Sequence, residues 1–167
     1  AMLERATRLN PEGLGTQCGD RRQTYAELQG RVARLAGGLR SLGLADGDRV
    51  GILSLNSDRY FESIFGVSWA GCCMVPLNTR WALPENEYAV GDSGAKALLF
   101  DDAFAEQSHS LLQSLADLEI AVYMGDGACP DWATSYESLV SSNDALPASQ
   151  RSGEDMAGIF YTGGTTG

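Results

Sequence analysis

The sequence is poor in residues on which several kinds of site depend. Among its 167 residues there is one histidine, His109, and one lysine, Lys96. A single histidine does not favour a metal site or a Ser–His or Cys–His triad. Lys96 lies far from the glycine-rich end of the chain, so the Walker-type phosphate loop, GxxxxGK[ST], is not favoured either.

Cysteines and long apolar runs are also scarce. Cys72 and Cys73 are adjacent in an apolar run, and Cys18 and Cys129 are isolated, so neither a zinc spacing nor a CxxC redox motif is present. We expect reduced, structural thiols. No apolar run approaches the roughly 20 residues that cross a bilayer, and the N-terminus carries no basic-then-apolar signal region. The sequence therefore predicts no membrane span and a cytoplasmic protein.

Basic residues are outnumbered, with 12 Lys and Arg against 22 Asp and Glu and a formal net charge of −10. This balance argues against a protein that binds nucleic acid or anionic membranes through a basic surface. A nucleotide ligand stays compatible with it, because backbone N–H groups can bind phosphate without a net positive charge.

Apolar periodicity and turn residues predict alternating helices and strands. We expect helices over residues 3–9, 24–43, 56–70, 84–91, 103–115 and 132–140. We expect strands at 15–18, 22–24, 49–55, 72–77, 97–100, 119–124 and 156–162, with a polar connector at 141–155. This order predicts an α/β fold in which a doubly wound, mostly parallel sheet has helices on both faces, after a short N-terminal helix and a hairpin.

Several side chains receive structural interpretations first. A capping box at residues 24–27 starts the best-signalled helix, whose apolar stripe is Leu28, Val32, Leu35 and Leu39. The inner side of the next helix is predicted to be Phe61, Ile64, Phe65 and Trp69. Core packing is favoured for Tyr25, Tyr60, Phe61, Phe65 and Trp69, and helix N-capping for Asp101 and Asp102. Arg80, after a strand end, is predicted to face either a ligand or a partner in a surface or inter-subdomain ion pair.

The end of the chain is the part that points to chemistry. Glycines allow positive φ and bring consecutive N–H groups close to an anion, and threonine hydroxyls add donors. The candidate binding residues are Thr162, Gly163, Gly164, Thr165, Thr166 and Gly167. From composition alone, a flexible Gly/Thr turn between strands is an equally good interpretation. In an open parallel sheet, ligands bind at the carboxyl ends of strands, where this segment is predicted to lie.

The segment 161–167, YTGGTTG, resembles the phosphate loop YTSG[ST]TGxPKG of the adenylate-forming superfamily, except for Gly163, where Ser is usual. The segment 23–28, QTYAEL, is similar to the LTYxEL segment of that superfamily, and 69–80, WAGCCMVPLNTR, is similar to xAGxxxVPLNxR. Residues 42–50 also fit LGLxxGDRV. The resemblance covers nearly the whole chain. The PLNTR motif favours acyl-CoA or aryl-CoA ligases over peptide-synthetase domains.

The resemblance implies that the complete enzyme uses ATP and Mg²⁺ to turn a fatty or aryl carboxylic acid into acyl-AMP, and then transfers the acyl group to coenzyme A. By the same match, residues 162–167 would wrap the β- and γ-phosphates. The proline–lysine half of the loop, the acyl pocket, the magnesium-binding glutamate and the catalytic lysine lie beyond Gly167 in the family. We therefore expect residues 1–167 to be an N-terminal subdomain, cut within the phosphate loop, that is inactive alone.

Two further expectations follow, and other interpretations stay open. A piece of a larger domain should expose apolar surface, so a homodimer that covers this surface is expected. A self-contained α/β binding or regulatory module is the main alternative to the ligase, and the residues encoded after Gly167 would separate the two. A nicotinamide or flavin oxidoreductase is disfavoured, because no GxGxxG follows the strand at 49–55.

Overall fold

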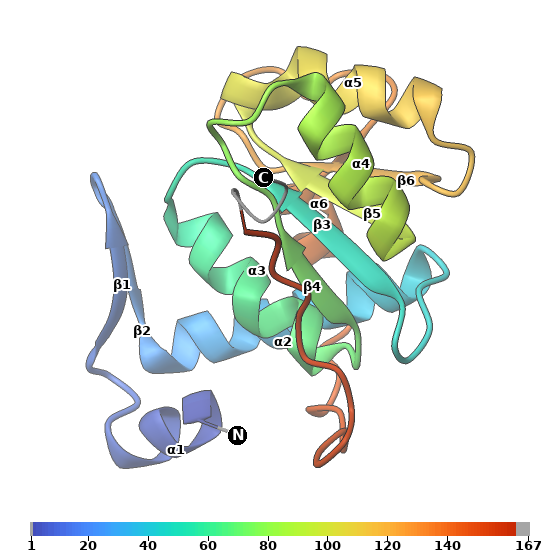
Figure 1. The fold of residues 1–167 in the computed structure, drawn as a ribbon. Helices are drawn as coiled ribbons and strands as arrows, with labels where there is room; N and C mark the ends of the chain where they lie inside the picture. Colours follow the sequence, from blue (N-terminus) through green and yellow to red (C-terminus); the bar gives the residue numbers. More distant parts are fainter. Residues whose placement is uncertain (1, 163–167) are drawn as a thin grey trace.

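The computed structural model describes residues 2–162, and in these a parallel sheet lies between two layers of helices (Figure 1). The helices are α1 (Met2–Leu9), α2 (Tyr25–Ser41), α3 (Asp58–Trp69), α4 (Leu83–Ser93), the 3-10 helix η1 (Asp102–Phe104), α5 (Ala105–Ser114) and α6 (Tyr136–Ser142). The strands are β1 (Leu14–Cys18), β2 (Arg21–Thr24), β3 (Arg49–Leu53), β4 (Cys73–Pro76), β5 (Ala95–Phe100), β6 (Ile120–Tyr123) and β7 (Thr134–Ser135).

The strands form two sheets, as predicted. The larger has the order β4-β3-β5-β6-β7, and all of its pairs are parallel. Strands β1 and β2 pair antiparallel around Gly19, whose φ of 58° lies in the region that glycine tolerates best. The hairpin and α1 stand at one side of the molecule, beside α2 and α3 (Figure 1). The doubly wound α/β prediction is confirmed.

The two faces of the parallel sheet are covered by different helices. Helices α2, α3 and α6 contribute to one core cluster with Ile52 and Leu99 of the sheet. Helices α4 and α5 contribute to the other, with Leu53 and Leu98. Neighbouring residues such as Leu98 and Leu99 enter opposite cores because successive side chains of a strand point to opposite faces. The near-continuous apolar strands of the sequence follow from this burial on both sides.

Helix α2 forms as its sequence predicts. Thr24 is its N-cap, and the capping box with Glu27 is present in both directions. The side chains of the apolar stripe are completely buried: Leu28, Val32, Leu35 and Leu39. Gly43, just beyond the C-cap Leu42, has a φ of 97°, the conformation that glycine favours after a helix end.

Helices α2 and α3 pack closely because α3 has a glycine at the contact. A Cβ atom added to Gly66 would lie 2.3 Å from Cδ2 of Leu35, which is fully buried and cannot retreat. We expect Gly66→Ala to lower the free energy of unfolding by about 1–3 kcal/mol through overpacking. A Cβ atom added to Gly30 of α2 would meet no atom within 4 Å apart from its own stretch of the helix, so Gly30→Ala is the matched control and should stabilise by about 0.5–1 kcal/mol. Urea denaturation measures both, and equal effects of the two substitutions would contradict this packing.

The predicted inner side of α3 is correct for Trp69 and wrong for Phe61, while Ile64 and Phe65 are half-buried. The buried residues are Asp58, Arg59, Glu62, Ser63, Gly66, Val67 and Trp69, whereas Phe61 is 40% exposed and packs edge-on against Phe65. Of the five aromatic residues assigned to core packing, Trp69 is buried, and Tyr25, Tyr60 and Phe65 are partly buried against the core. The helix turns its polar side inward because Arg59 and Glu62 find charged partners there.

Two later predictions also need correction. The helix predicted for 132–140 starts at Tyr136, because Thr134 and Ser135 extend to pair with β6 and Ser135 caps the helix. The predicted strand at 156–162 forms only an isolated bridge between Gly158 and Met74 of β4. Within residues 2–162, no helix has the length and apolar character needed to cross a membrane.

Candidate functional site

The last described residues run along the edge of the sheet beside β4. The N–H of Met74 donates to the carbonyl oxygen of Ala157 at 3.1 Å, and the N–H of Ile159 donates to that of Met74 at 2.9 Å. The pairing is parallel, so the chain passes the carboxyl end of β4 and brings Thr162, which is exposed, to that edge of the sheet. Residues 163–167 lie outside the described residues, and the binding role of residues 162–167 stays a prediction.

Side chains of this segment alternate between the core and the surface. Ile159 and Tyr161 pack against the core cluster shared with α4 and α5, while Phe160 is 65% exposed. The Tyr161 hydroxyl donates to the Asp92 carboxylate of α4 at 2.6 Å. Burial and the neighbouring Asp92 raise the pKa of Tyr161 to about 12, so the hydroxyl keeps its proton near neutral pH. The segment is thereby tied to α4 as well as to β4.

The loop after β4 lies at the same edge of the sheet. Asn78 holds this loop with two hydrogen bonds. The side-chain oxygen of Asn78 accepts from the N–H of Arg80 at 2.9 Å, and the backbone carbonyl oxygen of Asn78 accepts from the N–H of Trp81 at 3.1 Å. The Arg80 side chain is exposed and has no ion-pair partner among residues 2–162. Of the interpretations given to Arg80, a surface ion pair within residues 2–162 is wrong, whereas a ligand contact and an inter-subdomain ion pair stay predictions.

The crevice between β3 and β5, where the helices change face, is occupied by Asp101. Its carboxylate accepts from the Ser54 hydroxyl at 2.9 Å and from the N–H of Leu55 at 2.7 Å. It also caps η1, which confirms the N-capping prediction for Asp101. Asp102 instead accepts from the Tyr123 hydroxyl and from two backbone N–H groups, so its N-capping prediction is wrong.

Comparisons with known proteins bear directly on this arrangement. The family described as AMP-binding enzyme matches residues 3–167. The chain belongs to this family. Feruloyl-CoA synthase of Amycolatopsis sp is 36% identical over 163 residues, which are 98% of this chain and 30% of the relative. The long-chain-fatty-acid–CoA ligase FadD13 of Mycobacterium tuberculosis is 34% identical over 151 residues, which are 89% of this chain and 28% of the relative.

A solved structure agrees with the family assignment. The anthranilate CoA ligase AuaEII in complex with anthranoyl-AMP matches with a TM-score of 0.92 and 29% identity, over 99% of this chain and 32% of that chain. The chain thus spans about 30% of the length of the curated relatives that it matches.

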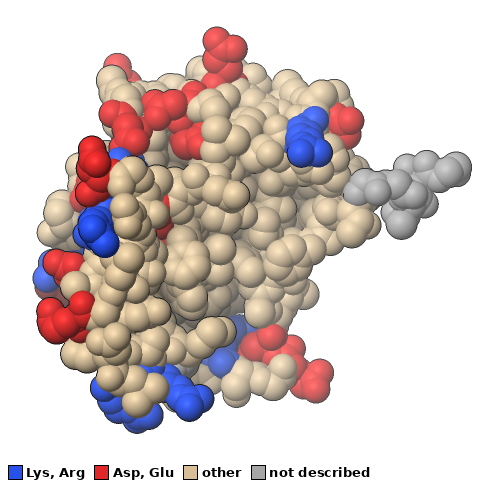
Figure 2. All heavy atoms as spheres, turned by 90° about the vertical axis from the view of Figure 1, so that its left-hand side faces the viewer, with Lys and Arg blue, Asp and Glu red and all other residues tan. Residues whose placement is uncertain are grey.

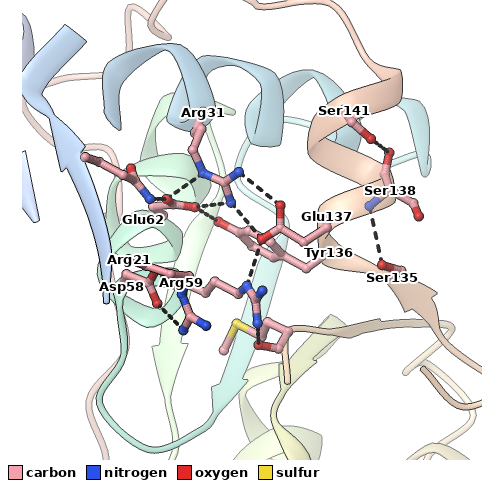
Figure 3. Close-up of polar contacts among 12 residues, drawn as sticks. Arg21, Arg31, Asp58, Arg59, Glu62, Ser135, Tyr136, Glu137, Ser138 and Ser141 are labelled. Atoms are coloured by element: carbon pink, nitrogen blue, oxygen red, sulfur yellow. Dashed lines mark hydrogen bonds and ion pairs between the residues drawn. The ribbon is translucent and has the colours of Figure 1, made fainter. Parts of the chain in front are cut away.

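Away from the β4 edge, this AMP-binding family member contains a partly buried cluster of charged side chains (Figure 3). Glu62, which is fully buried, accepts from Arg31 at 2.7 Å and from the Tyr136 hydroxyl at 2.7 Å. Arg59 pairs with Glu137 at 2.8 Å and donates to the carbonyl oxygen of Met124. These contacts join α2, α3 and α6 on one face of the sheet. Because the arginines already bind carboxylates, we interpret the cluster as a support for the fold.

The cluster also predicts how stability depends on pH. Asp58 of α3 belongs to the same cluster and pairs with Arg21 at 2.8 Å. Burial alone would raise the pKa of Asp58 and of Glu137, but their arginine partners outweigh it and hold both pKa values below the ordinary range. A carboxylate whose pKa is lowered by folding stabilises the fold above its unfolded pKa, about 4, and loses that contribution as the pH falls through the folded value. We therefore expect the free energy of unfolding to decrease from pH 5 to pH 3. Urea denaturation across this range tests it, and a constant or rising value would contradict the assignment.

The four cysteines are free thiols, as the sequence analysis expects. They are Cys18, Cys72, Cys73 and Cys129, and burial raises the pKa of Cys72 to about 11. Such a thiol stays protonated and unreactive near neutral pH. In the part of the chain that the structure describes, no group of three His, Cys, Asp or Glu residues is placed to hold a metal ion.

The structure adds two features that the sequence analysis missed. The contact between Tyr161 and Asp92 joins residues 69 positions apart, and no local pattern predicts it. The second feature, the polar inner side of α3, does have a signal in the sequence. Arg59, Glu62 and Ser63 share a helical face with the small residue Gly66, and this spacing indicates that a polar face packs closely against a neighbouring helix.

Proposed function

We propose that these 167 residues are the N-terminal subdomain of the large domain of an ATP-dependent acid–thiol ligase. In the full-length enzyme a carboxylate oxygen of the acid attacks the α-phosphate of ATP, which releases pyrophosphate and leaves acyl-AMP. The thiol sulfur of coenzyme A then attacks the acyl carbon, and AMP leaves. The observation that supports the proposal is the course of the chain beside β4, which brings exposed Thr162, the first residue of the proposed phosphate-binding segment, to the carboxyl edge of the sheet.

The chemistry of the tail suits a triphosphate. Threonine hydroxyls and glycine N–H groups are donors that phosphate oxygens accept, and we assign this role to residues 162–167. Mg²⁺ carried by the ATP would neutralise phosphate charge during transfer. Exposed Arg80, at the same edge and without a partner in residues 2–162, offers a further positive charge to an anionic ligand.

The acid substrate is proposed as a class. The relatives are named for ferulate, long-chain fatty acids and, in a solved structure, anthranilate, so fatty or aryl carboxylic acids are the class to test. The coverage of about 30% of these relatives supports a piece of a ligase over a self-contained binding module. The cytoplasm, where ATP and coenzyme A are available, is the proposed compartment, and the free thiols are compatible with it.

We also propose that the isolated chain forms a homodimer through its uncharged face. Figure 2 shows this face, hollowed in the middle and with the charged side chains around its margin. A cavity of about 360 Å³ opens between β1 and the start of α3, beside Phe61. Exposed apolar side chains of the chain include Leu14, Leu55, Phe61 and Phe160. Light scattering at high concentration should give a dimer, and a monomer would contradict the proposal.

The isolated chain should not carry out adenylation. We expect no pyrophosphate release above the buffer background when residues 1–167 are mixed with ATP, Mg²⁺ and fatty or aryl acids. Half of a phosphate loop binds ATP weakly, because ordering it on binding costs conformational entropy that no other contact offsets. The proposed acyl pocket is also not part of these residues. The assay is coupled pyrophosphate detection, with the full-length ligase as the positive control. Acid-dependent release by the isolated chain would overturn the assignment of this part as non-catalytic.

A further inference from the structure

Tyr161 is the side chain that holds the chain just before the glycine–threonine tail. Its hydroxyl donates to Asp92 at 2.6 Å, and its ring packs edge-on against Tyr88 with 6.3 Å between the ring centroids. Both partners belong to α4. The ring also rests on the core cluster that contains Leu53 and Val75. Tyr161 therefore connects the segment beside β4 to the helix that follows β4.

The rest of the segment is held weakly. Its backbone makes two hydrogen bonds to Met74, through Ala157 and Ile159, and within the described residues no backbone hydrogen bond is made after Ile159. Met156 and Phe160 are 56% and 65% exposed. The position at which Thr162 leaves the sheet edge is thus fixed by the side chain of Tyr161, next to it in the sequence.

We propose that Tyr161 and Asp92 are positioning residues, whose hydrogen bond fixes the point from which the tail, residues 162–167, reaches a bound triphosphate. This inference rests on the proposed function. Neither residue needs to touch ATP: the bond acts by placing the donors of the tail. Burial and Asp92 hold the pKa of Tyr161 at about 12, so the hydroxyl donates across the neutral range.

The first test uses the 167-residue chain and needs no activity. Tyr161→Phe and Asp92→Ala should each make the Ile159 amide exchange with solvent about threefold to tenfold faster, the effect of losing one hydrogen bond. The Leu77 amide, which donates to Ile52 at 2.9 Å inside the sheet, should not change. Tyr88→Phe removes a hydroxyl from the other ring of the pair and is the matched control. In the double variant, the Ile159 amide should exchange no faster than in either single variant. If Tyr161→Phe leaves the exchange rate of the Ile159 amide unchanged, Tyr161 does not hold this segment.

The second test uses the full-length ligase. Tyr161→Phe and Asp92→Ala should raise the KM for ATP about threefold to tenfold, with kcat and the KM for the acid within about twofold of the parent, since only the phosphate contacts are displaced. Asp92→Asn keeps an acceptor for the hydroxyl and should recover part of the loss. An active enzyme whose KM for ATP is unchanged in Tyr161→Phe overturns the positioning role and leaves the ligase proposal standing. If the parent enzyme shows no acid-dependent pyrophosphate release, the ligase proposal is wrong. The exchange experiment alone then tests whether Tyr161 and Asp92 hold the segment.

Discussion

Glu62→Ala should destabilise the protein by about 3–5 kcal/mol, the cost of breaking a buried ion pair from one side. Glu62 is fully buried, and its carboxylate accepts from Arg31 and from Gln23 at 2.6 Å. The carboxylate also accepts from the hydroxyl of Tyr136, a residue that is only 1% exposed. Without the carboxylate, the Tyr136 hydroxyl loses its acceptor, and Arg31 keeps one carboxylate partner, Glu137. Because small domains are stable by only about 5–15 kcal/mol, this is a large share of the total.

The control for this prediction is an unpaired glutamate in another helix. Glu87 lies in α4 and makes no ion pair or side-chain hydrogen bond within residues 2–162, so Glu87→Ala should change the free energy of unfolding by about 0.5 kcal/mol or less. Glu62→Gln keeps the shape and one acceptor, and it should fall between the two. Urea denaturation measures all three variants. A loss below about 1 kcal/mol in Glu62→Ala would show that the cluster does not support the fold, by comparison with the expected cost.

Restoring serine at position 163 should strengthen ATP binding in the full-length ligase. The family usually has Ser where this chain has Gly163, so Gly163→Ser adds a hydroxyl donor beside the proposed triphosphate. A hydrogen bond to a charged group contributes about 1.5–3 kcal/mol, which corresponds to a KM for ATP lower by roughly tenfold to a hundredfold. The gain is smaller if water already occupies the place of the hydroxyl.

The Gly163→Ala variant separates the effect of the added hydroxyl from the effect of a stiffer backbone. Alanine restricts the backbone as serine does but adds no donor, so it should reproduce none of the fall in KM that depends on the hydrogen bond. Initial rates of pyrophosphate release at varied ATP give the KM for each variant. If Gly163→Ser leaves both the KM for ATP and the turnover unchanged, the tail does not contact the triphosphate at this position.

The fold was largely predictable because its signals are local. The capping box at Thr24 and the stripe that follows specify α2, and apolar runs bounded by turns specify the parallel strands. The inner side of α3 was not predictable from apolar periodicity, because Arg59 and Glu62 are buried through partners on α2 and α6 that only the tertiary structure brings near. The weak pairing of the 156–162 segment has a similar origin, since its length as a strand depends on neighbours rather than on its own residues.

The sequence predicts which residues form the candidate site, and this stays a prediction; it does not predict the contacts that hold the segment before them. Residue types in the tail, with the resemblance to a phosphate loop, indicate where phosphate chemistry belongs, and the described part of the chain leads to the expected edge of the sheet. The hydrogen bond from Tyr161 to Asp92 and the filling of the β3–β5 crevice by Asp101 depend on contacts across many residues. Side-chain geometry of this kind leaves no trace in composition or spacing.

The most direct measurement is acid-dependent pyrophosphate release by the full-length ligase and by its Thr165→Val, Thr166→Val variant. The account predicts release from ATP with at least one fatty or aryl acid, and in the variant a kcat/KM for ATP lower by about tenfold or more, since two donors to charged phosphate are lost. A parent enzyme that releases no pyrophosphate with any such acid, or a variant as efficient with ATP as the parent, would contradict it.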